Sequence, residues 1–480
     1  MDYKSILKLL SLIGMTLSLF FSLDVVVALI YGESYLSVLL FVTLFFAANF
    51  TIWLLLKSYP LNLGIRESIL AVNLLWLLLG VAGGVPLLLY TSISPSSAFF
   101  EAVSGFTTTG ATVFADIESL PKTVLFHRSL MHWLGGMGII VLGVGLLSVI
   151  NPTGSLALFK SESTGIQMEK LTPKIKHTAL SLWGVYIVLT LVDAVLLKMF
   201  GMGWFDAVNH AFSTVSTGGF STKNSSLGAF EGDGIVWTTT IFMILSGINF
   251  LAHLRVYYRD LSGYRSEEVK WYLTLFLLLS LTLVVVHEDF GSDTLYYTIK
   301  HSFFTIASVM TTTGFATVDY GGWSNLAIAV IFVAMLIGGN AGSTAGGVKV
   351  IRYVIIYKTL FAEFKRILHP SAMISVFVDG SKLKERILAA TFGFFFLYIL
   401  TIVALSIYIY AAGFDAMTAI SGALAMVGNI GPGFSLVGPS QNFGFFSDPD
   451  KIVLSVGMII GRLECYTVFV LFSAAFWKRF

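Results

Sequence analysis

The sequence predicts an all-α polytopic membrane protein with about ten transmembrane helices. Hydrophobic residues make up 56% of the 480 positions and charged residues only 12%, whereas charged residues are roughly a quarter of an ordinary soluble chain. Apolar stretches of the roughly 20 residues that a helix needs to cross a bilayer recur from one end of the chain to the other. A short segment that ends in a glycine-rich turn also occurs four times, which predicts four related units.

Ten stretches are long and apolar enough to be spans, and the first two precede the repeated units. The first stretch carries Asp24 and is followed at once by the second, so we interpret it as a retained span and not as a cleaved signal peptide. From the third stretch onward the spans form pairs, and each pair brackets one short segment. The spans are expected near residues 6–30, 35–56, 67–90, 127–150, 178–200, 235–257, 270–287, 324–360, 387–411 and 452–476.

The four short segments align on one glycine each. They read AFFEAVSGFTTTGATV, DAVNHAFSTVSTGGFST, HSFFTIASVMTTTGFAT and ISGALAMVGNIGPGFS, and the matched glycines are Gly110, Gly218, Gly314 and Gly431. Each unit is therefore predicted to contain a helix, a re-entrant half-helix, a turn and a second helix. The expected division of the chain is an N-terminal two-helix domain at 1–60 and four pore repeats at 61–152, 153–262, 263–370 and 371–480.

The fourth half-helix is expected to be longer than the second. The motif Phe-Asp-Ala begins at Phe205 and again at Phe414, which lie 13 and 17 residues before their matched glycines. If the two motifs are equivalent, the difference of four residues adds about one helical turn.

The distribution of basic residues predicts that the turns lie on the outer side of the membrane. Cytoplasmic loops of membrane proteins are enriched in Lys and Arg. Of the 29 basic residues, 22 fall in the N-terminus, in the loops that alternate with the turns, and in the C-terminal tail. Both termini are then cytoplasmic. The basic clusters at 349–366 and 382–386 are expected to contact lipid head groups or a cytosolic partner.

The turns are suited to binding a dehydrated monovalent cation. A segment that enters and leaves on one side ends in non-helical backbone at membrane depth, which is tolerated where it lines a wet cavity. Glycine lets this backbone turn its carbonyl groups toward a common axis. Four turns around one pore would give a ring of oxygen ligands like that of potassium channels, whereas a single TTTG would be only a polar turn. The candidate ion-binding residues are Thr108, Thr109, Gly110, Ser216, Thr217, Gly218, Thr312, Thr313, Gly314, Asn429, Ile430 and Gly431.

A glycine-rich run interrupts the predicted span 324–360. Residues 338–347 contain five glycines, and each costs a helix about 1 kcal/mol relative to alanine. We expect the run to unwind into an intramembrane loop; the alternative is close helix packing through small residues. The candidate gate residues in this run are Gly338, Gly339, Asn340, Gly342, Ser343, Thr344, Gly346 and Gly347.

Arg462 lies within the last predicted span, where burial of a charge is costly and points to a function. Two interpretations stay open: it faces the pore, or it forms a structural ion pair with Glu464 or another acid. Residues two apart do not face each other on a helix, which disfavours the pair with Glu464. In the pore, its charge would raise the barrier to cations and help to hold the glycine-rich loop in place.

The segments SGFTTTGATV, STVSTGGFST and MTTTGFATV resemble the filter motifs of the Trk/Ktr/HKT superfamily of potassium transporters. The resemblance covers nearly the whole chain, and the two extra N-terminal helices make it more similar to the membrane subunit of the bacterial Trk potassium-uptake system than to the shorter Ktr type. It implies K⁺ as the ion bound in the filter, no organic cofactor in this chain, and a place in the bacterial inner membrane. Glycine at position 110, where some sodium-transporting relatives carry serine, implies a preference for potassium.

The resemblance also has implications for control. It implies that the loop 338–347 obstructs the cytoplasmic half of the pore and that Arg462 matches an arginine of the family. It implies a homodimer among membrane lipids and a cytosolic nucleotide-binding ring protein as regulator, and no nucleic-acid partner. The fourth repeat departs from the pattern, because the run 429–433 has no threonine and places a proline after the matched glycine. The filter is therefore expected to be only approximately fourfold.

Three classes of function were compared: a gated, channel-like permease, a symporter coupled to sodium or protons, and a membrane enzyme. An enzyme would need paired carboxylates, a histidine cluster or a Ser/His pair in facing spans, and none is visible. The lone Cys465 supports neither a disulfide nor a zinc site. A symporter would need a second ion site, usually with a buried carboxylate, and no span from residue 67 onward offers a convincing acid other than Glu464. The channel-like permease is therefore favoured, with symport as the alternative.

Overall fold

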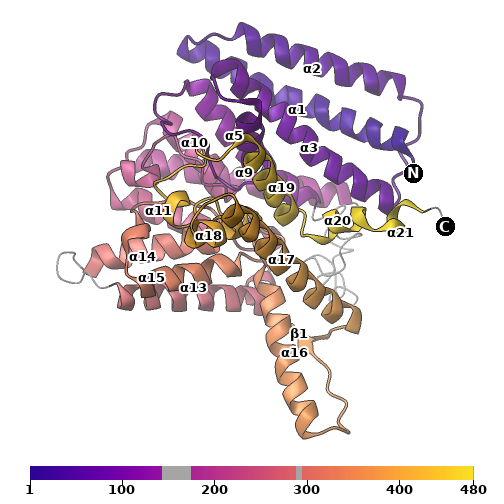
Figure 1. The fold of residues 1–480 in the computed structure, drawn as a ribbon, viewed down its shortest axis with the longest axis vertical. Helices are drawn as coiled ribbons and strands as arrows, with labels where there is room; N and C mark the ends of the chain where they lie inside the picture. The colour runs from indigo at the N-terminus through magenta and orange to yellow at the C-terminus, as the bar shows by residue number, and fades with distance from the viewer. Residues whose placement is uncertain (143–174, 288–294, 479–480) are drawn as a thin grey trace.

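The computed structural model describes residues 1–142, 175–287 and 295–478. Its regular structure is helical (Figure 1) except for one small hairpin formed by strands β1 (Phe377–Val378) and β2 (Ser381–Lys382). Within these residues six helices are long and apolar enough to cross a membrane, or eight if each of two bent helix pairs is one span. The predicted all-α, multi-span fold is confirmed, while the predicted boundary between the first two repeats, at 152/153, lies outside the described residues.

The two extra N-terminal helices form an antiparallel pair at one edge of the molecule (Figure 1). Helix α1 (Tyr3–Tyr31) packs against α2 (Leu36–Leu55) and also against the first repeat. The close approach of α1 and α2 requires Gly14, since a Cβ there would lie 2.3 Å from the side-chain oxygen of Asn49. On the other side of α1, the buried carboxylate of Asp24 lies 2.7 Å from Nδ1 of His127 in the first repeat. The pair is thus fastened to the repeats by a polar contact as well as by apolar packing.

The rest of the chain forms four units of a first helix, a half-helix and a second helix. In the first unit these are α3 (Ile65–Tyr90), α4 (Pro95–Phe106) and α5 (Lys122–Leu142). In the second unit they are α9 (Ile175–Met199), α10 (Trp204–Val215), and the pair α11 (Asp233–Ser246) and α12 (Phe250–Tyr257). In the third unit they are α13 (Glu267–Val286), α14 (Leu295–Met310), and the pair α15 (Asn325–Ile337) and α16 (Val350–Leu368). In the fourth unit they are α17 (Glu385–Ala411), α18 (Ala416–Gly428), and the pair α19 (Asp448–Arg462) and α20 (Tyr466–Phe469). The described residues also contain short elements, which are 3₁₀ helices at Ser226–Ala229, Ser262–Arg265, Tyr320–Gly322, Ser435–Val437 and Val470–Phe472, and α21 (Ala474–Trp477).

The four half-helices pack in a cyclic order. Each one contacts the helices of its own unit and the second helix of the preceding unit: α4 packs on α19, α10 on α5, α14 on α11, and α18 on α15. Because the first unit follows the fourth in this order, the units enclose a common axis. The C-terminal ends of the half-helices therefore meet there.

Two predicted spans are broken instead of continuous. The span predicted at 235–257 bends by 96° between α11 and α12, and the one predicted at 452–476 bends by 111° between α19 and α20. In the first, Gly247 ends α11 and Asn249 caps α12 by accepting a hydrogen bond from Leu251 N at 2.8 Å. In the second, Glu464 and Cys465 both take positive φ angles, which a helix does not contain. Both breaks are short and lie between apolar stretches, so hydropathy alone joins the helices.

The prediction that the fourth half-helix is about one turn longer than the second is wrong. Helices α4 and α10 have 12 residues each and α18 has 13. The two Phe-Asp-Ala motifs are not equivalent, because Asp206 lies in the first turn of α10, whereas Asp415 precedes α18 and caps it. An aspartate is favourable at either position, as a helix cap or as a charge near the positive end of the helix dipole.

Candidate functional site

The four turns share one backbone pattern. A residue with a left-handed backbone conformation follows each half-helix, either directly or after one intervening residue. A glycine that also has a positive φ angle lies two residues after this left-handed residue. Non-glycine residues pay roughly 1–2 kcal/mol for this conformation, so its recurrence in four places reflects a strong structural requirement. The left-handed residues are Thr108, Thr217, Thr312 and Asn429, with φ of 53° to 56°. The glycines, called the ring glycines below, are Gly110, Gly219, Gly314 and Gly431, with φ of 81° to 94°.

The pattern corrects the alignment of the second repeat by one residue. The glycine equivalent to Gly110 is Gly219 and not Gly218, which lacks a positive φ angle. A Cβ on Gly218 would instead lie 2.3 Å from the ring of His132. The triplet 217–219 is thus equivalent to 108–110, and Ser216 is the residue that ends α10. The remaining predicted residues keep their alignment.

Each ring glycine lies against a carbonyl oxygen of the next repeat, so the four turns close a cycle. The oxygen belongs in every case to the residue just before the next ring glycine; these four are called the ring carbonyls. A Cβ on Gly110 would lie 2.1 Å from the carbonyl oxygen of Gly218, and a Cβ on Gly219 would lie 2.0 Å from that of Thr313. A Cβ on Gly314 would lie 2.2 Å from the carbonyl oxygen of Ile430, and a Cβ on Gly431 would lie 2.5 Å from that of Thr109. No Cβ atom tolerates such distances, so only glycine lets the turns approach this closely.

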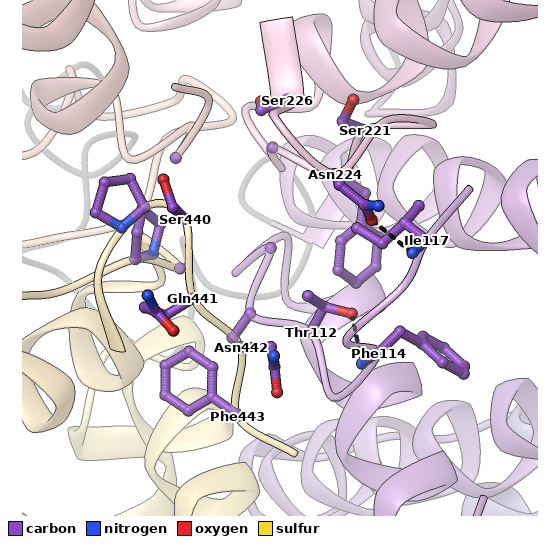
Figure 2. A pocket seen from close by; sticks show the side chains of 18 of the residues that line it. Thr112, Phe114, Ile117, Ser221, Asn224, Ser226, Ser440, Gln441, Asn442 and Phe443 are labelled. Atoms are coloured by element: carbon purple, nitrogen blue, oxygen red, sulfur yellow. Dashed lines mark hydrogen bonds between the residues drawn. The ribbon is translucent and has the colours of Figure 1, made fainter. Parts of the chain in front are cut away.

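All four ring glycines line one cavity of about 100 Å³. Figure 2 shows its wall, where the side chains of Asn224, Ser440, Gln441 and Asn442 lie among those of the turns. Asn224 joins two repeats, because its Oδ1 accepts a hydrogen bond from Ile117 N at 2.7 Å. The same amide donates to Asp116 at 3.0 Å and lowers the pKa of that carboxyl group below its usual value. The mouth of the site is thus built mainly of neutral polar groups.

The threonines of the turns fasten the backbone to the half-helices. The hydroxyl of Thr107 lies 2.7 Å from that of Thr109, and the hydroxyls of Thr311 and Thr313 form the same pair at 2.7 Å. None of these four side chains lines the cavity. In the fourth repeat the amide of Asn429 takes over the role, donating to the hydroxyl of Thr109 at 3.0 Å and to the carbonyl of Met458 at 3.0 Å. The groups of the turns that remain for a ligand are backbone carbonyls and the buried hydroxyl of Thr108, which has no hydrogen-bond partner among the described residues.

Residues 338–349 form a non-helical loop between α15 and α16, as predicted. The loop contacts the turns on the side away from the cavity. The hydroxyl of Thr344 donates to the carbonyl of Val215 at 3.0 Å, and Gly346 N donates to the hydroxyl of Thr312 at 2.6 Å. A Cβ on Gly346 would lie 2.4 Å from the carbonyl oxygen of Gly428. The loop therefore touches the ends of three half-helices at once.

The predicted gate residues all belong to this loop except Arg462, and all are shielded from solvent. Gly342 and Gly347 are half-buried, and the other loop residues named as candidates are buried. Three of the glycines have positive φ, at 71° to 82°, which explains their density: Gly338, Gly342 and Gly347. The alternative of close helix packing is wrong for this run, because it is not helical.

Two features anchor the loop: the break between α11 and α12 in the second repeat, and Glu268, an acid that was not predicted from the sequence to have this role. Asn340 N donates to the carbonyl of Gly247 at 2.8 Å, which uses the backbone freed where α11 ends. The buried Oε1 of Glu268, at the start of α13, accepts hydrogen bonds from Ala341 N at 2.6 Å and from Ile351 N at 3.3 Å. An acid at the first turn of a helix has an ordinary explanation in the helix dipole, so the sequence gives no separate signal for this role.

Arg462 lies at the end of α19 and is 4% exposed. Its Nη1 donates to the carbonyl of Thr344 in the loop at 3.0 Å, and its Nε and Nη2 have no hydrogen-bond partner among the described residues. Glu464 pairs instead with Arg352, at 2.6 Å. The interpretation of Arg462 as half of an ion pair with Glu464 is therefore wrong, and its contact is with the loop.

A buried ion pair beside the ring was not predicted from the sequence. Glu101 on α4 and Arg128 on α5 are 0% and 1% exposed and form an ion pair at 2.8 Å. The signal was present in the sequence, since both are charges within apolar segments, the same argument that singled out Arg462.

Comparison with known proteins decides the family. Residues 37–479 match the family TrkH, which is described as a cation transport protein. The chain belongs to the TrkH family. It is 36% identical to the Trk system potassium uptake proteins TrkH of Vibrio parahaemolyticus and of Escherichia coli K12, in each case over 100% of both chains. It is 35% identical to TrkG of Escherichia coli K12 over 94% of both chains.

The fold agrees with this membership. The crystal structure of the potassium transporter TrkH from Vibrio parahaemolyticus matches the whole chain with a TM-score of 0.90 at 33% identity and covers 100% of both chains. The resemblance found in the sequence and the predicted fold class are both confirmed. The TrkH family consists of transport proteins, so the chain is a transporter and not an enzyme.

Removing the side chain of Glu268 is expected to loosen the loop. In Glu268→Ala the amides of Ala341 and Ile351 lose a charged acceptor, worth about 1–3 kcal/mol. Hydrogen–deuterium exchange at 338–351 should become roughly tenfold to a hundredfold faster. The neighbouring variant Glu267→Ala is the control, because Glu267 contacts Lys358 and Asp379 and not the loop. Equal exchange in the two variants would contradict the anchoring role.

Proposed function

We propose that this chain carries K⁺ across the bacterial inner membrane through the ring glycines, with the ring carbonyls as ligands and both chain termini in the cytoplasm. The observation that carries the proposal is the closed cycle of glycine–carbonyl contacts, which joins four turns of one chain around one axis. Potassium as the ion is supported by the full-length relatives, which are named as potassium uptake proteins. The glycine at position 110 agrees with this preference.

The chemistry that the ring offers is replacement of the ion's hydration water by carbonyl oxygens. The half-helices add partial negative charge, because their C-terminal ends point at the ring. Since a carbonyl of the next repeat fills the place of each glycine side chain, no turn can shift without moving its neighbour. The size of the ring is thus a property of all four repeats together, and it supports discrimination among cations that differ in radius.

The loop 338–349 and Arg462 are proposed as the gate. Two hydrogen bonds and the close approach of Gly346 to Gly428 hold the loop against the ends of the half-helices, and the guanidinium group of Arg462 donates to Thr344 at its centre. A buried cation with two unpartnered donor groups next to the conduction path raises the energy of a passing cation. Movement of the loop would remove the obstruction and would carry the carbonyl of Thr344 away from Arg462.

Regulation by a cytosolic nucleotide-binding protein and assembly as a homodimer are also proposed. The relatives are named as proteins of a Trk system, which supports a further component. Helix α16 extends away from the rest of the molecule (Figure 1) and carries exposed aromatic and basic side chains that a partner or a second copy can cover. These exposed residues include Tyr357, Phe361, Phe364, Lys365 and Arg366.

Symport coupled to sodium or protons is the second candidate, and one observation favours it. Asp193 on α9 is 0% exposed, and neither carboxyl oxygen has a hydrogen-bond partner among the described residues. It lies beside Thr214 of the second half-helix, whose hydroxyl donates to the main-chain carbonyl of His210 at 2.7 Å. The expectation that Glu464 is the only convincing acid from residue 67 onward is therefore wrong. A buried carboxyl group near the ring is a feature that a coupled transporter could use.

Ion flux into liposomes containing the purified chain separates the two candidates. The channel-like permease predicts ⁸⁶Rb⁺ uptake that follows the potassium gradient alone, with no change when a sodium or proton gradient is imposed. Uptake driven against the potassium gradient by sodium or protons, and lost in Asp193→Asn, would show symport instead. Protein-free liposomes give the background. No uptake under any gradient would contradict both.

Serine at position 110 is expected to weaken discrimination against sodium. The new Cβ would fall on the carbonyl of Gly218 and force the ring open. The ratio of K⁺ to Na⁺ permeability should fall by roughly tenfold, which corresponds to about 1.4 kcal/mol. Gly322→Ser is the control, since nothing lies within 4 Å of a Cβ there. An unchanged ratio in Gly110→Ser would rule out the ring as the filter.

Truncation of Arg462 is expected to raise basal flux. In Arg462→Ala both the obstructing charge and the bond to Thr344 are lost, and a barrier lower by about 1.4 kcal/mol gives roughly tenfold faster uptake. Arg265→Ala, which removes an exposed arginine far from the loop in sequence, should leave uptake unchanged. Uptake in Arg462→Ala that equals that of the unaltered chain, measured on the same liposomes, would argue against this gate.

A further inference from the structure

Arg128 on α5 contacts the turns of two different repeats. Its Nε donates to Glu101 Oε1 at 2.8 Å, and its Nη2 donates to the hydroxyl of Thr112, two residues after the first ring glycine, at 3.2 Å. Its Nη1 donates to the carbonyl of Ser221, two residues after the second ring glycine, at 3.2 Å. All of the guanidinium nitrogens are therefore engaged, and the side chain lies at the wall of the cavity above the ring.

Glu101 holds the first turn from behind. Its Oε1 accepts from the hydroxyl of Thr112 at 3.0 Å as well as from Arg128, and its Oε2 accepts from Val113 N at 2.8 Å. The carboxylate thus needs both oxygens as acceptors. A glutamine could not replace it, because one of the two positions would become a donor facing a donor.

Phe220 connects the second turn to the same face of α5. It follows Gly219 directly and is 2% exposed. The guanidinium carbon of Arg128 lies 4.0 Å from its ring centroid, and the ring of His132 stacks on it at 4.0 Å with an interplanar angle of 13°. A guanidinium group over an aromatic ring is attracted by the ring's quadrupole, more so where water is excluded.

The other repeats have no such arrangement at the equivalent positions. The residue nine positions before the ring glycine is Glu101 in the first repeat, His210 in the second, Thr305 in the third and Gly422 in the fourth. The ring of His210 contacts the hydroxyl of Ser221 at 2.9 Å and the carbonyl of Asp206 at 2.8 Å, and both of these residues belong to its own repeat. The ion pair is therefore a special feature of the junction between repeats 1 and 2.

Stability alone does not account for the buried ion pair between Glu101 and Arg128. A buried ion pair gives little or no net stabilisation compared with apolar residues of the same size, because both charges lose their hydration. What this pair provides is direction, since a planar guanidinium group donates in fixed directions to acceptors on two turns.

We infer that Glu101, Arg128, His132 and Phe220, called the clasp, set the selectivity of the ring by fixing its first two turns, an inference that rests on the proposed function. These side chains are positioning residues, since the ring carbonyls are the groups proposed as ligands of the ion. The clasp holds each turn just after its ring glycine. With the clasp loosened, the carbonyls of Thr109 and Gly218 can follow a smaller ion inward, and the ring then accepts sodium.

Three variants test the clasp by bi-ionic flux in liposomes. Glu101→Gln removes one acceptor, Arg128→Lys keeps the charge but loses the planar fork, and Phe220→Leu keeps an apolar side chain but loses the ring. Each should lower the ratio of K⁺ to Na⁺ permeability, with Glu101→Gln lowering it by about tenfold. Asp233→Asn, which breaks a surface ion pair with Lys300, should keep the ratio of the unaltered chain.

The ratio is informative because a purely structural role would change the amount of folded protein and not the preference between two ions. Ratios that stay unchanged in Phe220→Leu and Arg128→Lys, with potassium flux retained, would overturn the inference even if Glu101→Gln fails to reach the membrane. Absence of potassium flux in the unaltered chain would overturn the proposed function and the clasp with it. A lowered ratio in at least two variants and an unchanged one in Asp233→Asn is the expected result.

Discussion

The structure depends on one constraint: the place of each ring glycine's side chain is taken by a carbonyl oxygen of the next repeat. This makes the four turns a single mechanical unit, although they are up to about 320 residues apart in the chain. It also explains the cyclic packing of the half-helices, because each must lean on the second helix of the preceding unit to bring its turn into contact. The positive φ angles on both sides of each ring carbonyl are the backbone cost of this arrangement, and glycine keeps that cost low at one of the two positions.

The second helices provide the loop that is proposed as the gate. Continuous helices would leave no free backbone below the turns, whereas the helices of repeats 2, 3 and 4 are interrupted at that depth. Two bonds join freed backbone groups, since Asn340 N donates to the carbonyl of Gly247 and Phe250 N donates to that of Gly342. The carbonyl of Thr344 instead accepts from the side chain of Arg462. Non-helical backbone at membrane depth must find internal partners, so a loop in one repeat demands complementary breaks in its neighbours. Sequence reasoning found the long break, which has five glycines, and missed the two short ones.

The sequence was sufficient for the class of fold, the four units and three of the four ring glycines. Prediction from the sequence failed where the local residues are compatible with two arrangements. At Gly218 and Gly219 both residues can take positive φ, and only the contact with Thr313 of the next repeat selects the second. The Phe-Asp-Ala motifs misled for a similar reason, since an aspartate suits a helix cap and a first turn equally well. The partners of Arg462 depend on how units distant in sequence meet, and spacing along one helix could exclude Glu464 without identifying Thr344.

The four repeats are nearly alike where the backbone lines the ring and unlike where side chains support it. Each repeat must offer the same carbonyl at the same place, so its backbone cannot vary. The residues behind the turn have no such restriction, and Glu101 of repeat 1 has a histidine, a threonine and a glycine as counterparts. The clasp therefore supports the turns of repeats 1 and 2, while the loop that is proposed as the gate belongs to repeat 3 and contacts an arginine of repeat 4. A single chain can divide support and control among its repeats in this way, which four identical subunits cannot do.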